Sequence, residues 1–312
     1  MTALTVQPLR DDLSFGSRVF GVTQDSLGDE AIRLQLAELF WDRGLLVFEG
    51  VDPTSSMQVA LSEVFGPLKD HPSAATPRAQ GDGAVGVIEI RHRPDEAGVV
   101  EVGGQRLSQW LPWHFDHCYN DELNRAGVLR AVEIPPEGGR TGFVDGIALY
   151  ETISPELRAR IEGQEVLYAM DVIMDNLIYG RPDGFAAVAE SPQASAVMDE
   201  FAGRPRAIHP AVWQRETGEK VLHVSPWMAK GVVGQSEAEG DELLHAVSDE
   251  IVAAAEQLSY FHQWAPTDMV IWDNWRILHR VSGMAPEHPR CMHRTTIKGD
   301  YGLGRFETLA SV

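Results

Sequence analysis

The chain has 312 residues, of which 44% are hydrophobic and 23% are charged, and its formal net charge is −20. This length is enough to bury a full core, and the composition is that of an ordinary soluble globular protein. The strong negative charge argues against nucleic acid or an anionic membrane surface as a partner. An anionic ligand would have to be bound by local arginines, against the overall field.

The cysteine content and the N-terminal residues indicate the compartment. Cys118 and Cys291 are too few for a disulfide framework and suit a reducing environment. The first residues carry no basic region followed by an apolar run, so we expect no signal peptide. No stretch approaches the ~18 uninterrupted apolar residues that a membrane helix needs. We therefore expect a cytoplasmic protein without a membrane partner.

The first third of the chain predicts helices around one buried strand. Apolar residues at helical spacing, each run followed by a glycine, predict helices over 29–43 and 54–65, with a strand at 45–48 between them.

Residues 72–112 are rich in Pro, Gly, Ala and charged side chains, and only 85–90 predict a strand there. The part at 91–109 is interpreted as a long mobile connection. Such loops in compact domains are often lids over active sites, and an ordinary surface loop is the alternative.

The remainder alternates strands with fewer helices. Short apolar runs bounded by turn residues predict strands, and capped runs of helical period predict helices. The strands are expected at 128–134, 142–144, 165–172, 220–224, 269–272 and 294–298, and the helices at 154–163, 194–201 and 241–258. With no repeat and no linker, we expect one domain over 1–312. The expected fold class is mainly β with flanking helices, on a double-stranded β-helix (jelly roll) core.

A histidine and a carboxylate stand two residues apart in Trp113-His114-Phe115-Asp116. On a β-strand, His114 and Asp116 would point to the same face, because successive side chains alternate. One imidazole and one carboxylate, joined by a second imidazole, form the facial triad that holds non-haem Fe(II) and leaves open positions. A strand-end histidine beside a solvated aspartate is the alternative, so a third ligand must be found.

A candidate third ligand lies near the C-terminal end. His279 follows the predicted strand at 269–272, and two arginines, Arg290 and Arg294, come after it. Guanidinium groups match the geometry of carboxylates and sulfonates. Paired arginines beside a candidate metal ligand in an acidic chain therefore indicate capture of an anion.

Taken together, these segments resemble the Fe(II)- and 2-oxoglutarate-dependent dioxygenases of the taurine dioxygenase and 2,4-dichlorophenoxyacetate dioxygenase type. The resemblance covers residues 65–296, and its joint order and spacing make it specific. It rests on Trp113-His114-Phe115-Asp116, Gly138-Gly139-Arg140-Thr141, Trp272-Asp273-Asn274 with His279, and Met292-His293-Arg294.

The resemblance implies a metal centre and a co-substrate site. His114, Asp116 and His279 would be the ligands of Fe(II). Thr141 and Arg290 would hold the distal carboxylate of 2-oxoglutarate, and O2 would be the second co-substrate.

The resemblance also implies a site for a small organic acid. Arg294 would bind its acidic head, with a structural ion pair as the alternative. His71, in Phe65-Gly66-x-Leu68-x-x-His71-Pro72, would also reach the substrate or would simply cap a loop. Since relatives are commonly dimers or tetramers, a homo-oligomer is expected.

Two departures from taurine-specific relatives bear on the substrate. Where those relatives carry a tyrosine and an asparagine, this chain has Ala74 and Trp110. The site loses two polar contacts and gains an aromatic wall, so we expect Trp110 to contact a bulky or aromatic carboxylate rather than taurine. The candidate lining residues are Met170, Ile173, Met174 and Leu177.

The expected activity couples oxidative decarboxylation of 2-oxoglutarate, giving succinate and CO2, to hydroxylation of this acid, with or without bond cleavage. A desaturase or another oxidase on the same iron site, within a biosynthetic pathway, is the alternative. Two further alternatives are a zinc hydrolase using the same ligands and a non-catalytic jelly-roll protein.

Overall fold

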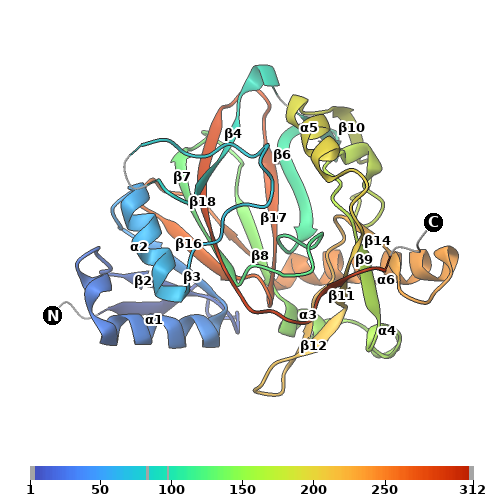
Figure 1. The fold of residues 1–312 in the computed structure, drawn as a ribbon, viewed down its shortest axis with the longest axis horizontal. Helices are drawn as coiled ribbons and strands as arrows, with labels where there is room; N and C mark the ends of the chain where they lie inside the picture. Colours follow the sequence, from blue (N-terminus) through green and yellow to red (C-terminus); the bar gives the residue numbers. More distant parts are fainter. Residues whose placement is uncertain (1–3, 82–83, 97, 309–312) are drawn as a thin grey trace.

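Strands dominate the molecule, and helices pack on their outer faces (Figure 1). The structure is a computed structural model that describes residues 4–81, 84–96 and 98–308. The two ends of the expected 1–312 domain, and Ala97 of the expected loop, lie outside the described residues. The fold class is mainly β with flanking helices, as the sequence predicts.

The larger sheet of the described residues has the strand order β1-β2-β3-β16-β7-β18-β4. All its neighbours pair antiparallel except β2 and β3, which are parallel. Its strands are β1 (Thr5–Pro8), β2 (Ser17–Phe20), β3 (Leu45–Glu49), β4 (Val87–His92), β7 (Ala126–Glu133), β16 (Met269–Asp273) and β18 (Arg290–Ile297).

The second sheet has the order β10-β5-β6-β17-β8-β15 and is antiparallel throughout. Its strands are β5 (Val99–Val102), β6 (Gln105–His114), β8 (Thr141–Asp145), β10 (Ala186–Ala189), β15 (Tyr260–His262) and β17 (Ile277–Met284). Two small sheets complete the described part, with strands β9 (Glu165–Tyr168), β11 (Ala207–Pro210), β14 (Ala229–Val232) and β19 (Arg305–Phe306), and β12 (Val212–Gln214) and β13 (Lys220–Leu222).

The two large sheets face each other across an apolar layer. Leu129, Trp272 and Met292 of the larger sheet form one buried cluster with Phe143 and Ile277 of the second sheet. The Phe143 and Trp272 rings lie 5.7 Å apart. This layer continues into the cavity described below, so the sheets form both the core and the walls of the site.

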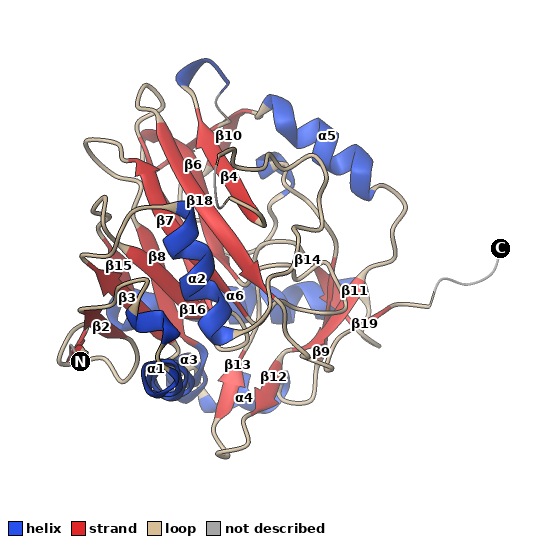
Figure 2. Ribbon diagram, turned by 60° about the vertical axis from the view of Figure 1, so that its left-hand side comes forward, coloured by secondary structure: helices blue, strands red, loops and turns tan. Residues whose placement is uncertain are grey.

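Helices α1 (Glu30–Arg43) and α2 (Ser55–Phe65) cover the outer face of the larger sheet (Figure 2). Both begin and end as the sequence predicts. Asp29 accepts a hydrogen bond from the Ala31 N–H at 2.9 Å, and Thr54 accepts one from the Met57 N–H at 3.2 Å. Gly44 ends α1 with a φ of 68°, which glycine adopts without steric cost.

The remaining helices are α3 (Gly146–Thr152), α4 (Pro155–Ile161), α5 (Pro192–Phe201) and α6 (Glu237–Leu258), with single 3₁₀ turns η1 (Ser26–Gly28), η2 (Pro94–Glu96) and η3 (Met174–Asn176). Helix α6 begins four residues before its predicted start, because Ser236 and Glu239 form a capping box. Among the described residues, no helix combines the length and apolar character needed to cross a bilayer.

The prediction of a mobile connection over 91–109 is wrong for its described residues. Strand β4 runs to His92, and β5 and β6 form an antiparallel hairpin in which Val102 pairs with Gln105. Gly103 and Gly104 form the turn with φ values of 57° and 76°, which suit a two-residue hairpin turn. This Gly-Gly pair between alternating residues was the sequence signal for the hairpin.

Strand β9 is shorter than the predicted strand at 165–172. It ends at Tyr168, whose neighbours across the small sheet are Ala207 and Ala229. The chain then leaves the sheet, and Met170 and Val172 line the cavity instead.

Candidate active site

His114 and His279 face each other across two neighbouring strands. They are direct partners in the β6–β17 register, and their ring centroids lie 4.1 Å apart. His114 Nδ1 hydrogen-bonds the Pro112 carbonyl at 2.8 Å, which leaves Nε2 with the free lone pair that a metal ligand requires. His279 lies within strand β17, which the sequence did not predict; its ring is 4.8 Å from that of Trp272.

Asp116 lies in a turn after the end of β6. The prediction that it shares a strand face with His114 is therefore wrong, and other contacts fix its position. Its backbone is held instead by Asn274, a fully buried residue in the turn between β16 and β17. The Asp116 N–H donates to Asn274 Oδ1 at 2.7 Å, and Asn274 Nδ2 donates to the Asp116 carbonyl at 3.0 Å. Sequence reasoning gave Asn274 no role, although it stands in one of the motifs that carry the resemblance.

These three side chains form a buried cluster suited to a metal ion. One ligand atom from each of His114, Asp116 and His279 lies within 4.8 Å of the other two. Asp116 Oδ2 has no hydrogen-bond partner among the described residues, as expected of an atom whose partner is a metal ion. Two imidazoles and one carboxylate are the ligand set of the non-haem Fe(II) facial triad, so the residues present fit that ion.

The electrostatics of this cluster favour its ligand forms. Burial would raise the pKa of the Asp116 carboxyl, but the Arg294 guanidinium and the nearby imidazoles hold it well below its usual range. Burial lowers the pKa of His114, and burial with the neighbouring His114 lowers that of His279. At neutral pH the cluster therefore holds a carboxylate and two neutral imidazoles.

Arg294 joins the metal cluster to the cavity. Its Nη1 donates to Asp116 Oδ1 at 2.9 Å, and both side chains are buried. Its Nε and Nη2 have no partner among the described residues, and the side chain lines the cavity. A free Nε–Nη2 edge can bind a carboxylate by donating two parallel hydrogen bonds to its oxygens.

Arg290 and Thr141 lie on facing strands, β18 and β8, and both line the cavity. Arg290 Nη1 donates to Gln109 Oε1 at 2.7 Å, and its Nε has no partner among the described residues. Burial lowers the pKa of Arg290 to about 10, which still leaves it charged at neutral pH. Thr141 Oγ1 accepts from Trp264 Nε1 at 3.2 Å and keeps its proton for another acceptor.

The Gly138-Gly139 segment allows Arg290 to lie close to the neighbouring turn. A Cβ at Gly139 would approach Arg290 Nε to 3.2 Å, and the φ of this glycine is 64°. Both features favour glycine here.

The cavity has a volume of about 420 Å³ and a mainly apolar lining, with polar side chains at the metal cluster, around Arg290 and Thr141, and along the loop that carries His71. Its expected lining residues Met170 and Met174 are found there, whereas Ile173 and Leu177 line neighbouring surface hollows. Val172 of the segment after β9 also lines the cavity. Sequence reasoning did not find further apolar lining residues from α5 and from the 227–228 turn, which are Ala194, Val197, Trp227 and Met228.

His71 lines the cavity, as expected. The Ser73 N–H donates to His71 Nδ1 at 3.2 Å, which leaves the ring proton on Nε2. Burial, followed by the nearby Arg294, lowers the pKa of His71 to about 4, so the ring is neutral at neutral pH. Glu200 of α5 holds this loop by accepting from Ser73 Oγ at 2.7 Å and from the Ala74 N–H at 2.9 Å.

Trp110 does not line the cavity that the described residues form, so its expected contact with the substrate is wrong for this structure. It packs against Phe185, with ring centroids 5.3 Å apart. The β6–β17 register slips between His279 and Val281, which face His114 and Leu111. This bulge reverses the alternation along β6, so Gln109 and Leu111 face the cavity and Trp110 faces away.

A second cluster of possible metal ligands, Glu89, Cys291 and His293, lies on the other side of β18. Arg91 donates two hydrogen bonds to Glu89 at 2.8 Å, and Arg130 Nη2 contacts His293 Nδ1 at 3.0 Å. Because a guanidinium only donates, His293 Nδ1 accepts and the proton lies on Nε2. The Glu89 and His293 ligand positions are therefore already engaged within the protein.

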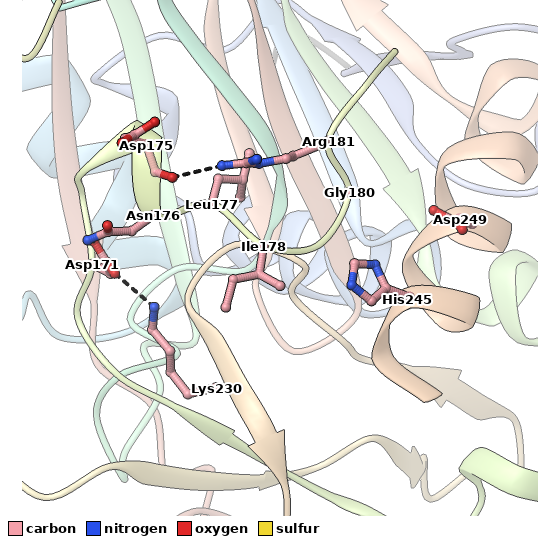
Figure 3. A pocket seen from close by; sticks show the side chains of 10 residues that line it. All are labelled: Asp171, Asp175, Asn176, Leu177, Ile178, Gly180, Arg181, Lys230, His245 and Asp249. Carbon is pink, nitrogen blue, oxygen red and sulfur yellow. Dashed lines mark hydrogen bonds and ion pairs between the residues drawn. The ribbon is translucent and has the colours of Figure 1, made fainter. Parts of the chain in front are cut away.

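An open hollow of about 800 Å³ lies between the segment after β9 and helix α6 (Figure 3). Lys230 in this hollow is paired with Asp171 at 2.8 Å, and Arg181 donates to the Asp175 carbonyl at 2.7 Å. His245 and Asp249 face them from α6. Both cationic side chains here have partners, whereas Arg294 in the buried cavity keeps its Nε and Nη2 without a partner among the described residues.

Comparisons with known proteins agree with this arrangement. The model of the family described as "Taurine catabolism dioxygenase TauD, TfdA family" matches residues 5–296. The (S)-phenoxypropionate/alpha-ketoglutarate-dioxygenase of Sphingobium herbicidovorans is 29% identical over 309 residues, with 96% of each chain covered. Pentalenolactone F synthase of Streptomyces arenae is 28% identical over 233 residues, covering 72% of this chain and 73% of that protein.

The fold is also found among solved structures. A taurine dioxygenase from Burkholderia xenovorans superposes with a TM-score of 0.68 at 24% identity, covering 96% of this chain and 92% of that one. The family match includes every residue of the metal cluster and both arginines, and it favours the dioxygenase over the hydrolase and the non-catalytic protein. The chain belongs to the taurine catabolism dioxygenase TauD, TfdA family and is an Fe(II)- and 2-oxoglutarate-dependent dioxygenase.

Proposed function

We propose that the enzyme couples conversion of 2-oxoglutarate, to succinate and CO2, to hydroxylation of a bulky apolar or aromatic carboxylic acid, with or without bond cleavage. The observation that carries this proposal is the free Nε–Nη2 edge of Arg294 in a cavity with apolar walls. We assign the two large sheets to the faces of a double-stranded β-helix that holds the site between them.

The metal and co-substrate roles follow from the side chains that converge. His114, Asp116 and His279 would hold Fe(II), and Thr141 with Arg290 would bind the distal carboxylate of 2-oxoglutarate. When bound, Fe(II) with 2-oxoglutarate and O2 supplies the oxidising power for a C–H bond of the substrate. The protein residues orient that bond and exclude water from it.

Arg294 would bind the acid head of the substrate while it keeps its contact with Asp116. Its Nη1 is occupied by Asp116 Oδ1, but the Nε–Nη2 edge remains available for two parallel hydrogen bonds. His71 Nε2–H would donate a further bond. These local donors bind an anion in a chain whose net charge is −20, because they act inside a buried cavity where screening is weak.

The body of the substrate would lie against the apolar wall of the cavity, formed by Met170, Val172, Met174, Val197 and Trp227. Thioethers and an indole pack well against aromatic and branched groups. The relative from Sphingobium herbicidovorans is named for (S)-phenoxypropionate, an aryloxy carboxylate, which supports this substrate class.

A second candidate is an oxidation other than hydroxylation, such as a desaturation within a biosynthetic pathway, at the same site. The similarity over 72% of the chain to a protein named as a synthase, pentalenolactone F synthase, supports the biosynthetic part of this candidate. The acid head and the apolar wall would serve this reaction equally.

Succinate release tests the proposal. Purified protein with Fe(II), 2-oxoglutarate and O2 is offered aryloxy and arylalkyl carboxylates, bulky alicyclic carboxylates and taurine. We expect succinate to rise with at least one bulky carboxylate, to stay at background with taurine, and to vanish in the His114→Ala variant. Product masses separate the two candidates, because hydroxylation adds one oxygen atom whereas desaturation removes two hydrogens. Turnover with taurine alone would contradict the proposed substrate class.

A further inference from the structure

His117 is a buried histidine of the turn after β6 that has no role so far. It lines the cavity and is only 4% exposed. Neither of its ring nitrogens has a hydrogen-bond partner among the described residues. Its φ is 60°, in the left-handed region that few residues other than glycine adopt.

Both features are unfavourable for the free protein. A buried polar group without a partner loses its hydrogen bonds to water, and a left-handed backbone crowds the Cβ of a histidine. Such features persist where the surrounding structure imposes them, and they occur frequently at binding sites. The turn that carries Asp116 therefore also directs an unpartnered imidazole into the cavity.

The groups around His117 indicate what it could bind. The His71 ring lies 5.3 Å away, nearly perpendicular, and the preceding residue, Asp116, accepts a 2.9 Å hydrogen bond from Arg294. Arg294 and His71 both carry free donors, so three nitrogen-bearing side chains meet at one end of the cavity. A carboxylate offers about four lone-pair positions on two oxygens. Two N–H groups of Arg294 and the Nε2–H of His71 would occupy three of these lone-pair positions.

We propose that His117 is a specificity-determining residue that donates the fourth hydrogen bond to the carboxylate head of the substrate. This inference rests on the proposed function, because it requires the acid head at Arg294. Because Arg294 only donates, the NH2 group of the matching primary amide would meet a guanidinium N–H that it cannot accept from, so the site would favour the acid over the amide. Buried polar groups left unpaired in this way give strong discrimination between substrates.

The test measures binding rather than turnover. The protein is loaded with Mn(II) and N-oxalylglycine, and (S)-phenoxypropionate, other aryloxy carboxylates and their primary amides are titrated. Quenching of the fluorescence of Trp227 and Trp272, which line the cavity, reports binding. In His117→Gly we expect the Kd of the acids to rise about tenfold, the loss of one hydrogen bond to a charged group, while that of N-oxalylglycine stays within about twofold.

Two variants separate loss of the imidazole from loss of the fold. Glycine adopts a φ of 60° freely, so the melting temperature of His117→Gly should not fall below that of the wild type. Asparagine tolerates the same backbone and carries a donor, so His117→Asn should recover part of the affinity. His245→Ala, a histidine change at the outer hollow, should leave acid binding unchanged.

The outcomes distinguish this inference from the proposed function. If Arg294→Met weakens acid binding and His117→Gly does not, the role of His117 is wrong and the proposed function stands. Equal binding of acids and amides by the wild type would contradict recognition of the acid head by Arg294, on which the inference rests. If wild type binds no acid of the series, or Arg294→Met binds as well as wild type, the acid-head proposal fails and the inference fails with it.

Discussion

Arg290 and Arg294 stand four residues apart on β18 and line the same cavity, yet their hydrogen bonds give them different capacities. Arg290 contacts Gln109 and the Gly139 carbonyl beside Thr141, away from Asp116. Arg294 contacts Asp116 and keeps one edge free. At the residue scale, the atoms that the fold leaves unpaired indicate which ligand each side chain can take.

Methionine substitutions should therefore separate the two arginines. Arg290→Met should raise KM for 2-oxoglutarate about ten- to a hundredfold, through loss of charge-assisted hydrogen bonds, and leave affinity for the carboxylate substrate nearly unchanged. Arg294→Met should show the reverse pattern. Steady-state kinetics with each co-substrate varied in turn measures both, and similar effects of the two variants on both KM values would contradict the assignment.

Asn274 acts through Asp116 and is a positioning residue. Its side chain makes two hydrogen bonds to the Asp116 backbone, and it also donates to Asn124 Oδ1 at 3.1 Å. Asn274→Ala should lower Fe(II) affinity about ten- to a hundredfold, the usual effect of losing a group that orients a metal ligand. Metal titration of the anaerobic protein measures this. Unchanged affinity would mean that the turn keeps its shape without the amide.

At the scale of elements, helix α5 and the loop that carries His71 cover the same end of the cavity. Glu200 joins them by accepting from Ser73 and from two backbone N–H groups, those of Ala74 and Ala75. The loop is attached to the larger sheet at Leu68 and at Arg78, on either side of His71. His71 is therefore held both within the loop, where Arg78 donates to its carbonyl at 3.2 Å, and by the contact of the loop with α5 through Glu200.

Glu200→Ala should raise KM for the carboxylate substrate severalfold and leave KM for 2-oxoglutarate unchanged, because the loop holding His71 loses its anchor. Rescue by Glu200→Asp, which keeps the charge, would support a positioning role. An effect on both KM values would instead indicate a general loss of structure.

The same contact should depend on pH. Hydrogen bonds from Ser73 and Ala74 lower the pKa of Glu200 below its usual 4.5. Because the folded form has the lower pKa, this stabilisation is present above pH 4.5 and is lost as the pH falls through the lowered value. Amide hydrogen exchange of residues 73–75 in wild type and Glu200→Gln should converge at acid pH and differ at neutral pH.

For the whole molecule, a buried ion pair joins parts that lie far apart in the sequence. Arg276 donates two hydrogen bonds to Asp145, at 2.9 and 2.8 Å, and a third to the Asp42 carbonyl at the end of α1. Asp145 also caps α3 by accepting from the Ile147 N–H. This pair links the first helix, the second sheet and the turn that carries Asn274.

Asp145→Ala should destabilise the protein by about 3–5 kcal/mol, because it leaves a buried guanidinium without its partner. Glu242→Ala, which removes the exposed partner of Arg160, should change the free energy of unfolding by less than about 1 kcal/mol. Urea unfolding of the metal-free variants measures both. Equal costs would mean that the Arg276–Asp145 pair is solvated in solution.

The sequence by itself determined the features that local chemistry specifies. Helices α1 and α2 follow from a cap, a periodic apolar run and a terminal glycine, and the buried strands follow from continuous apolar runs. The His114 and Asp116 pair was found from residue types and spacing, the family resemblance implied the full set with His279, and the structure brings their ligand atoms within 4.8 Å. These features need no information about distant neighbours.

Only the tertiary structure decided which side chains face the cavity. One extra residue in β6 opposite β17 turns Trp110 away and brings Gln109 and Leu111 inward. Asp116 and His117 are aimed by a turn that Asn274 holds from another strand connection. Register and long-range hydrogen bonds depend on partners more than a hundred residues away, so composition and periodicity within a short window do not contain them.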